Sequence, residues 1–497
     1  MSGRLISEQK APEVVQYVMA PFLSGMADYF EVHLKIHKAH VLMLGETGLL
    51  SPADGQNLLR ALVELEAAGQ QGLVADANTD LYMQMERFIT ERTGALGGRM
   101  HTGRSRNDLY ATAARMMTRS KLLALLADVS KMQGMLLDKA EAHAATVMPG
   151  YTHMQHAEPV TYGHYLLAFH DAIARDMRRL WSAYDETNLN ALGAAALAGS
   201  SFALDRSRTA ALLGFDGIVE NSYDAVASRD YIVEAVSALA ILCGNVGRVA
   251  DQFILWVTSE YDMIDLPDSY GYTSSIMPQK RNPGYFIEAV RSRSARVSGH
   301  LMGVLATVKG TTFGHSRDMS YEITVPAYAA FEDATAVVNV MRGVIDAADP
   351  RREAMLVSCA GQFSGATEIA NLLAREAGLP FRSAYVVIAT LVRQSLERGL
   401  RPLDIRAQHV EAVAMEVLGH GVGLTDAQVQ GAMDPALNVQ MKQTVGSPSR
   451  RSMDAMLLSR QASAEADGRK LHERQAALLQ ADALLAAAIA ERLGTSG

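Results

Sequence analysis

The stretch Asp230–Tyr261, DYIVEAVSALAILCGNVGRVADQFILWVTSEY, decides the fold class. Apolar side chains recur in it every three or four residues, which is the spacing of one face of an α-helix. These side chains are Val236, Leu239, Cys243, Val246, Ala250 and Phe253. Strong hairpin signals are few elsewhere in the chain. The sequence therefore predicts an all-α protein.

Four more long helices are predicted on either side of this stretch. They span about residues 108–143, 160–187, 285–307 and 323–347, and each ends at proline, glycine or polar residues. Five long helices in the middle of a chain predict a bundle. Their small and apolar residues, together with the run Ala191–Ala198, exceed what one bundle can bury. This excess predicts contact with further subunits.

The length of the chain predicts more than one domain, because 497 residues with 49% hydrophobic content can form several cores, roughly three on length alone. We expect an N-terminal helical domain at 1–108, a central bundle at 109–350 and a C-terminal helical domain at 351–497. Within the last of these, the alanine-rich stretch Arg469–Arg492 predicts an amphipathic terminal helix.

Composition argues against several classes of partner. The net charge of −8 provides no basic face for nucleic acid. The two cysteines, Cys243 and Cys359, do not form a disulfide framework, and nothing resembles metal-ligand spacing. Met1–Lys10 lacks the apolar core of a signal peptide, and we find no apolar run of transmembrane length. These features predict a cytoplasmic protein without a membrane partner.

The segment Thr273–Pro283, TSSIMPQKRNP, carries the groups needed to remove a proton from carbon. Taking a proton next to a carboxylate leaves a dianion, which preorganised donors must stabilise. Lys280 supplies a positive charge and Asn282 an amide N–H. Ser274 or Ser275 can act as the base if this field and loop N–H groups deprotonate its hydroxyl.

This loop resembles the signature of the fumarase/aspartase superfamily, Ser-Ser-x-Met-Pro-x-Lys-x-Asn-Pro, and Gln279 is typical of its argininosuccinate lyase branch. Two further segments resemble signatures of that branch. His101–Asp108 presents a hydroxyl, a guanidinium and an amide in succession, which suits capture of a carboxylate. Pro149–His164 resembles the branch's Gly-Tyr-Thr-His segment.

The resemblance implies an assembly and a reaction. It implies a homotetramer whose central domains form a many-helix core, with each active site built from three chains. It also implies a carbon–nitrogen lyase that releases fumarate from a small-molecule adduct of aspartate. No metal or organic cofactor is expected, because the substrate's own carboxylate accepts the electrons.

The resemblance also implies roles for individual residues. Ser274 would remove the proton, and His153, oriented by Glu288, would be a second proton-handling group. The expected catalytic residues are Ser274, His153, Lys280 and Glu288. The expected binding residues for the succinyl part are Ser105, Arg106, Asn107, Thr152, Ser275 and Asn282. Gln155 and Met277 are further expected substrate-binding residues.

Departures from the branch gather where the other half of the substrate would be recognised. His33, His37, His315 and Arg317 replace an acid, a hydroxyl, a phenol and a lysine, and Tyr82 replaces a histidine. Gly284 replaces an aspartate, and one extra residue precedes Glu288. Because buried polar sites reject substrates that leave them unpaired, these changes predict a substrate other than argininosuccinate. The new cationic donors would suit an aminopolycarboxylate, such as iminodisuccinate or ethylenediamine disuccinate.

Three alternatives stay open. Argininosuccinate lyase activity with a rearranged pocket is the nearest. Another reaction of the superfamily, such as hydration of fumarate or cleavage of adenylosuccinate, is disfavoured by Gln279 and the His101–Asp108 segment. A catalytically silent structural protein, like the lens crystallins that resemble this branch, is disfavoured because Ser274, His153 and Lys280 are all retained.

Overall fold

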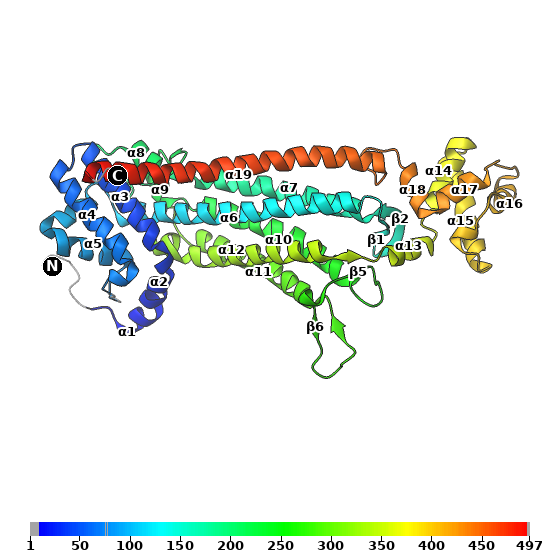
Figure 1. Ribbon diagram of the computed structural model, residues 1–497, viewed down its shortest axis with the longest axis horizontal. Coiled ribbons are helices and arrows are strands. Elements are labelled where there is room, and N and C mark those ends of the chain that lie inside the picture. Colours follow the sequence, from blue (N-terminus) through cyan, green and yellow to red (C-terminus); the bar gives the residue numbers. More distant parts are fainter. Residues whose placement is uncertain (1–8, 75, 77, 495–497) are drawn as a thin grey trace.

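The structure is a computed structural model that describes residues 9–74, 76 and 78–494, and long helices dominate it (Figure 1). Of the amino-terminal stretch examined for a signal peptide, residues 1–8 lie outside this description. The central bundle consists of α6 (Arg106–Ala142), α7 (Tyr162–Thr187), α10 (Asp230–Trp256), α11 (Tyr285–Lys309) and α12 (Thr324–Ala347). The predicted all-α fold and its five long helices are confirmed.

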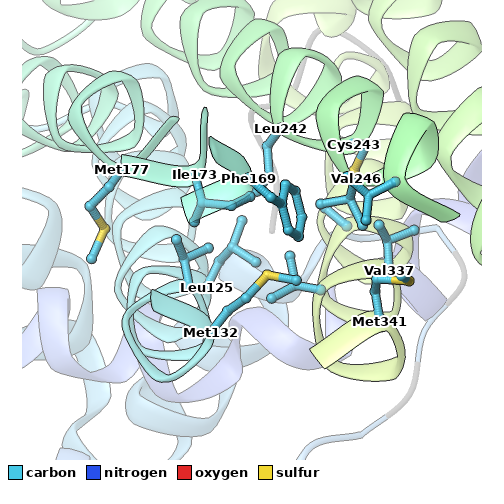
Figure 2. Packing of buried hydrophobic residues seen from close by; sticks show 14 of the residues in the cluster. Leu125, Met132, Phe169, Ile173, Met177, Leu242, Cys243, Val246, Val337 and Met341 are labelled. Carbon is cyan, nitrogen blue, oxygen red and sulfur yellow. The ribbon is translucent and has the colours of Figure 1, made fainter. Parts of the chain in front are cut away.

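The core of the bundle lies between α6, α7, α10 and α12 (Figure 2). Leu125 and Met132 of α6 face Phe169 of α7 there, with Val246 of α10 and Val337 of α12 beside them. The apolar face predicted for α10 is buried throughout, since each of its six predicted members has no exposed surface. Periodicity in the sequence therefore identified the face of α10 that packs in the bundle.

Helix α10 is also long and apolar enough to cross a membrane, judged by length and composition alone. The expectation that no stretch reaches this length was therefore wrong. Half of the apolar window is buried inside the bundle, where α10 packs against α7, α11 and α12. A core helix of a soluble protein passes the same test, because burial among other helices also favours apolar residues.

A second hydrophobic cluster lies at one end of the bundle. It is formed mainly by α3 (Phe30–Glu46), α4 (Pro52–Ala68) and α5 (Leu81–Thr93). The 3₁₀ helix η4 (Gly94–His101) follows α5 in the chain. Two of these helices are capped at their N-termini by side chains that accept a hydrogen bond from a backbone N–H group: Ser51 caps α4 and Asp80 caps α5. Shorter turns, α1 (Pro12–Val14), η1 (Val15–Met19), α2 (Ala20–Gly25) and η2 (Ala27–Tyr29), precede them.

A third cluster lies at the opposite end of the bundle (Figure 1). The helices at this end are α13 (Arg352–Ala360), α14 (Ala366–Glu376), α15 (Phe381–Glu397), α16 (Ala407–Leu418), α17 (Asp426–Met433) and α18 (Pro435–Met441). The last helix, α19 (Arg450–Leu493), then runs back along the whole bundle. The terminal helix predicted for 469–492 is confirmed and begins earlier, at Arg450. The domain boundaries at 108 and 350 stay a prediction.

The described strands are short and occur in pairs. Antiparallel pairs join β1 (Val147–Thr152) to β2 (Gln155–Thr161), β5 (Ile264–Asp265) to β8 (Asp349–Pro350), and β6 (Tyr272–Thr273) to β7 (Arg281–Asn282). A parallel pair joins β3 (Leu189–Asn190) to β4 (Gly217–Ile218), near the short helices α8 (Arg206–Leu212) and α9 (Ser222–Ala227). The β1–β2 and β6–β7 hairpins carry most of the expected catalytic residues.

Candidate active site

The β6–β7 hairpin projects from the side of the bundle and presents the Thr273–Pro283 segment to solvent (Figure 1). Within it, Ser274 Oγ accepts hydrogen bonds from the backbone N–H groups of Ile276 at 3.3 Å and Met277 at 3.0 Å. Two N–H groups aimed at one hydroxyl oxygen favour its negatively charged form. Ser274, rather than Ser275, therefore has the surroundings that the expected base requires.

Asn282 lies on the returning strand β7 of the same hairpin, and Lys280 directly precedes that strand. The Lys280 N–H donates to the Met277 carbonyl at 3.0 Å, and the Ser274 N–H donates to the Lys280 carbonyl at 3.4 Å. The turn therefore places the positive charge of Lys280 on the residue paired with Ser274. Ser275 and Met277 are also exposed on this hairpin.

A network of ion pairs anchors the base of the hairpin, and sequence reasoning did not identify it. Arg281 Nη1 lies 2.8 Å from Asp265 Oδ1, and its Nε lies 2.8 Å from Asp268 Oδ1. Arg281 also donates to the Leu266 carbonyl, and Arg351 reaches Asp265 at 3.6 Å. These partners raise the pKa of the Arg281 guanidinium and keep it charged. The acids spaced shortly before the loop were the sequence signal for this network.

His153 lies in the two-residue turn between β1 and β2. His153 and Met154 both adopt left-handed backbone conformations, with φ of 52° and 61°, while Thr152 pairs directly with Gln155. Thr152, His153 and Gln155 are exposed. Non-glycine residues are uncommon in this conformation, so the turn projects His153 into solvent at some cost in backbone strain.

The surroundings of the turn hold the hairpin in place. His156 Nε2 lies 3.2 Å from Tyr151 Oη and 3.3 Å from Ser358 Oγ of α13. Lys442 Nζ bridges Glu158 at 3.4 Å and the buried Glu368 at 3.2 Å. The hairpin that carries His153 is thereby fastened to the helices at that end of the bundle.

Ser105, Arg106 and Asn107 form the first turn of α6. Ser105 caps the helix in a capping box with Asp108, and Asn107 Nδ2 donates to the Ala196 carbonyl at 3.0 Å. Arg106 Nη1 lies 2.6 Å from Asp80 Oδ2. Burial raises the pKa of Asp108 to about 6, although nearby Arg104 and backbone N–H donors oppose that rise. The structure thus presents the predicted carboxylate-binding residues together at a helix N-terminus.

His33 and His37 lie close to this turn and are completely buried. Their ring centroids are 6.3 Å apart, and the His37 ring lies 5.8 Å from Tyr82. Tyr82 donates to Glu86 Oε1 at 2.8 Å. Burial lowers the pKa of His33 to about 3 and that of His37 well below its usual value. Both imidazoles are therefore neutral at physiological pH.

His315 and Arg317, the other two residues expected to recognise the amine half of the substrate, differ in charge. Burial and nearby Arg229 lower the pKa of His315 to about 4, which also leaves it neutral. Arg317 is charged, with its Nε 2.9 Å from Glu322 Oε1 and its guanidinium over the Phe22 ring. Of the expected cationic donors, Arg317 is therefore charged and the three histidines are neutral, while a role for these residues in substrate binding stays a prediction. Burial of the histidines depends on tertiary packing, which the sequence did not reveal.

Two of the three signature segments lie at opposite ends of α6 within one chain. Ser105–Asn107 begins α6, and the β1–β2 hairpin follows its end. Helix α6 has 37 residues, so these two groups are about 55 Å apart at 1.5 Å per residue. Among the described residues, the side chains of His153, Lys280 and Glu288 make no hydrogen bond or ion pair. The pairing of His153 with Glu288 stays a prediction.

Comparison with known proteins identifies the family. The model described as "Lyase" matches residues 53–299, and the one described as "Argininosuccinate lyase C-terminal" matches residues 363–440. An argininosuccinate lyase from Methanosarcina barkeri is 36% identical over 467 residues, which cover 93% of this chain and 92% of that one. Argininosuccinate lyase 1 from Shouchella clausii is 34% identical and covers 97% of both chains.

Solved structures of proteins from the same superfamily have a similar fold. EDDS lyase in complex with formate superposes with a TM-score of 0.87 at 32% identity, covering 98% of this chain and 97% of that one. A class II fumarase from Schistosoma mansoni has a TM-score of 0.69 at 15% identity, covering 87% of this chain and 96% of that one, and shows the shared fold alone.

The helical bundle and its exposed serine loop therefore define a lyase of the fumarase/aspartase type, and the protein is a carbon–nitrogen lyase. Within that superfamily the chain belongs to the argininosuccinate lyase-like branch.

Proposed function

We propose that the protein eliminates fumarate from an N-substituted aspartate. The observation that carries this proposal is the pair of backbone N–H groups directed at Ser274 Oγ, in a hairpin that also holds Lys280 and Asn282. A base, a cation and an amide on one exposed hairpin suit removal of a proton next to a carboxylate.

In the proposed reaction, the Ser274 oxygen takes the proton from the carbon β to nitrogen. The C–H electron pair passes into the neighbouring carboxylate and forms an aci-carboxylate, which Lys280 and Asn282 stabilise. These electrons then form the carbon–carbon double bond while the carbon–nitrogen bond breaks. The nitrogen keeps the bonding pair, takes up a proton and leaves as an amine. His153, with Glu288, is the second proton-handling group in this proposal.

The active site requires more than one copy of the chain in this proposal. The separation of Ser105–Asn107 from the His153 hairpin along α6 supports it, because one chain cannot bring both groups to one substrate. Exposed apolar side chains on the bundle support it as well, including Ile241 of α10 with Met302 and Leu305 of α11. We infer a homotetramer with sites shared between three chains, acting on a small molecule in the cytoplasm.

Two candidate substrates differ in the amine half that would be released. Argininosuccinate is supported by the names of the relatives, and an aminopolycarboxylate by the likeness to EDDS lyase. The neutral state of His33, His37 and His315 weakens the electrostatic reason for an extra carboxylate on the amine and leaves Arg317 as the cation of this set.

The test of the proposal is fumarate release, followed by ultraviolet absorbance, from argininosuccinate and a panel of N-substituted aspartates. Ser274→Ala reduces kcat by roughly 10²–10⁴-fold, the usual contribution of a positioned base. Ser182→Ala on α7 is the matched control, since its hydroxyl bonds only Glu234 far from the loop, and it leaves kcat unchanged. Activity of Ser274→Ala within about tenfold of the parent would assign the base to another residue.

A further inference from the structure

Three exposed aromatic side chains stand at the base of the serine hairpin. The rings of Tyr272 and Tyr285 stack with centroids 4.8 Å apart, and Phe286 meets them edge-on at 6.4 and 5.2 Å. Their exposed fractions are 56%, 46% and 39%. Because the three rings touch one another, they form one contiguous apolar patch beside the serine loop, where a bound group can cover them.

The pairing of the hairpin places this cluster on the reactive face. Tyr272 lies directly opposite Asn282, and Thr273 lies opposite Arg281. The bond from the Ser274 N–H to the Lys280 carbonyl continues the same register. Directly paired residues project to one side of a hairpin, and the sides alternate along it. Tyr272 and Asn282 therefore share a face with Ser274 and Lys280.

The face of the hairpin opposite to Ser274 carries Arg281 and the ion pairs that anchor the hairpin. Arg281 projects there and engages Asp265 and Asp268, so these two carboxylates are used on that side. On the reactive face the charged side chain is Lys280, and the position after Pro283 is occupied by Gly284. A substrate group beside Tyr272 therefore meets rings and a cation, with no acid in the hairpin to pair with a second positive charge.

We propose that Tyr272, Tyr285 and Phe286 form the wall that binds the amine half of the substrate. This half carries an aromatic or other flat apolar group next to the nitrogen. An apolar group buries its surface against the rings and needs no charged partner, whereas a guanidinium or a second ammonium finds no carboxylate in the hairpin to pair with. This inference rests on the proposed function and names the substrate class for the same site.

The experiment measures fumarate release from N-benzyl-aspartate, N-ethyl-aspartate, N-carboxymethyl-aspartate and argininosuccinate. The expected result is the highest kcat/KM for the benzyl adduct. Fumarate released from the other adducts with the benzyl adduct inert would overturn the inference and leave the proposed function standing. Fumarate released from none of them would overturn both.

Ring variants test the wall itself. Tyr285→Leu should raise KM for the benzyl adduct by about threefold to tenfold relative to the ethyl adduct, which is the range expected for one aromatic contact. Tyr285→Phe keeps the ring and should retain the parental ratio. Tyr385→Leu, at a ring that is 55% exposed on the distant α15, is the matched control. If the cluster is instead a contact between subunits, Tyr285→Leu changes the oligomeric mass with the KM ratio unaltered, and the inference fails.

Discussion

Removing the Arg281 side chain should slow turnover by loosening the hairpin that holds Ser274, Lys280 and Asn282. Arg281 makes two charge-assisted contacts of 2.8 Å and one bond to the Leu266 carbonyl. Asp268 is 92% exposed and Asp265 is 39% exposed, so solvent screens both ion pairs. Each exposed pair contributes about 0.2–1 kcal/mol and the carbonyl bond about 1 kcal/mol.

The sum is about 2 kcal/mol, which corresponds to roughly a 30-fold change in the equilibrium constant between the ordered and the disordered hairpin. Arg281→Met should therefore lower kcat by roughly tenfold or more, because the base and its stabilising donors act together only in the ordered state. Arg281→Lys keeps the charge and should recover part of this loss.

The assay is fumarate absorbance under saturating substrate, combined with limited proteolysis of the hairpin. Arg291→Met is the matched control, since Arg291 makes a longer exposed pair of 3.4 Å with Asp251 away from the hairpin. An Arg281→Met enzyme with kcat within about twofold of the parent would refute the reasoning, because the tether would then contribute nothing to the reactive geometry.

Two further outcomes follow from buried titratable groups. The free energy of unfolding should decrease as the pH falls from about 7 to about 5. In the folded chain burial lowers the pKa values of His33, His101 and His315 to about 3, 4 and 4, whereas in the unfolded chain these groups take up protons near pH 6.5. Urea unfolding at both pH values checks this, and equal midpoints would contradict it. Asp108, with its pKa raised to about 6, works in the opposite direction, as do Asp176 and Asp467, whose pKa values burial also raises. Asp108→Ala should lower the unfolding free energy by about 1–3 kcal/mol, because the N–H groups of Ser105, Gly193 and Ala195 lose their acceptor; Asp138→Ala on the same helix is the control.

Much of the bundle was predictable because its periodicity is local. The face of α10 from Val236 to Phe253 is read directly from spacing, and the same spacing gave the other long helices. The β1–β2 hairpin was not predicted, because its turn contains His153 and Met154 in the left-handed region without the usual glycine or asparagine.

The active site was predictable in its residue types and less so in its electrostatics. Residue types alone left Ser274 and Ser275 open, and the family resemblance selected Ser274, whose hydroxyl accepts the two backbone N–H groups in the structure. The charge state of His33 depends on complete burial between α3 and its neighbours, which no local pattern encodes. Arg281 lies inside the motif, but its role as the anchor of the hairpin became clear only from the strand pairing. That pairing places its side chain on the face opposite to Lys280, where it binds Asp265.

The course of α19 has a consequence for synthesis on the ribosome. Leu485 and Ile489, near the end of the chain, belong to the same hydrophobic cluster as α3 and α4. Those early helices leave the exit tunnel long before their last packing partners exist. Part of the apolar surface of the amino-terminal cluster therefore stays open until α19 has been synthesised. Truncating the chain by a few turns at its carboxyl end would expose the part of the molecule that was made first.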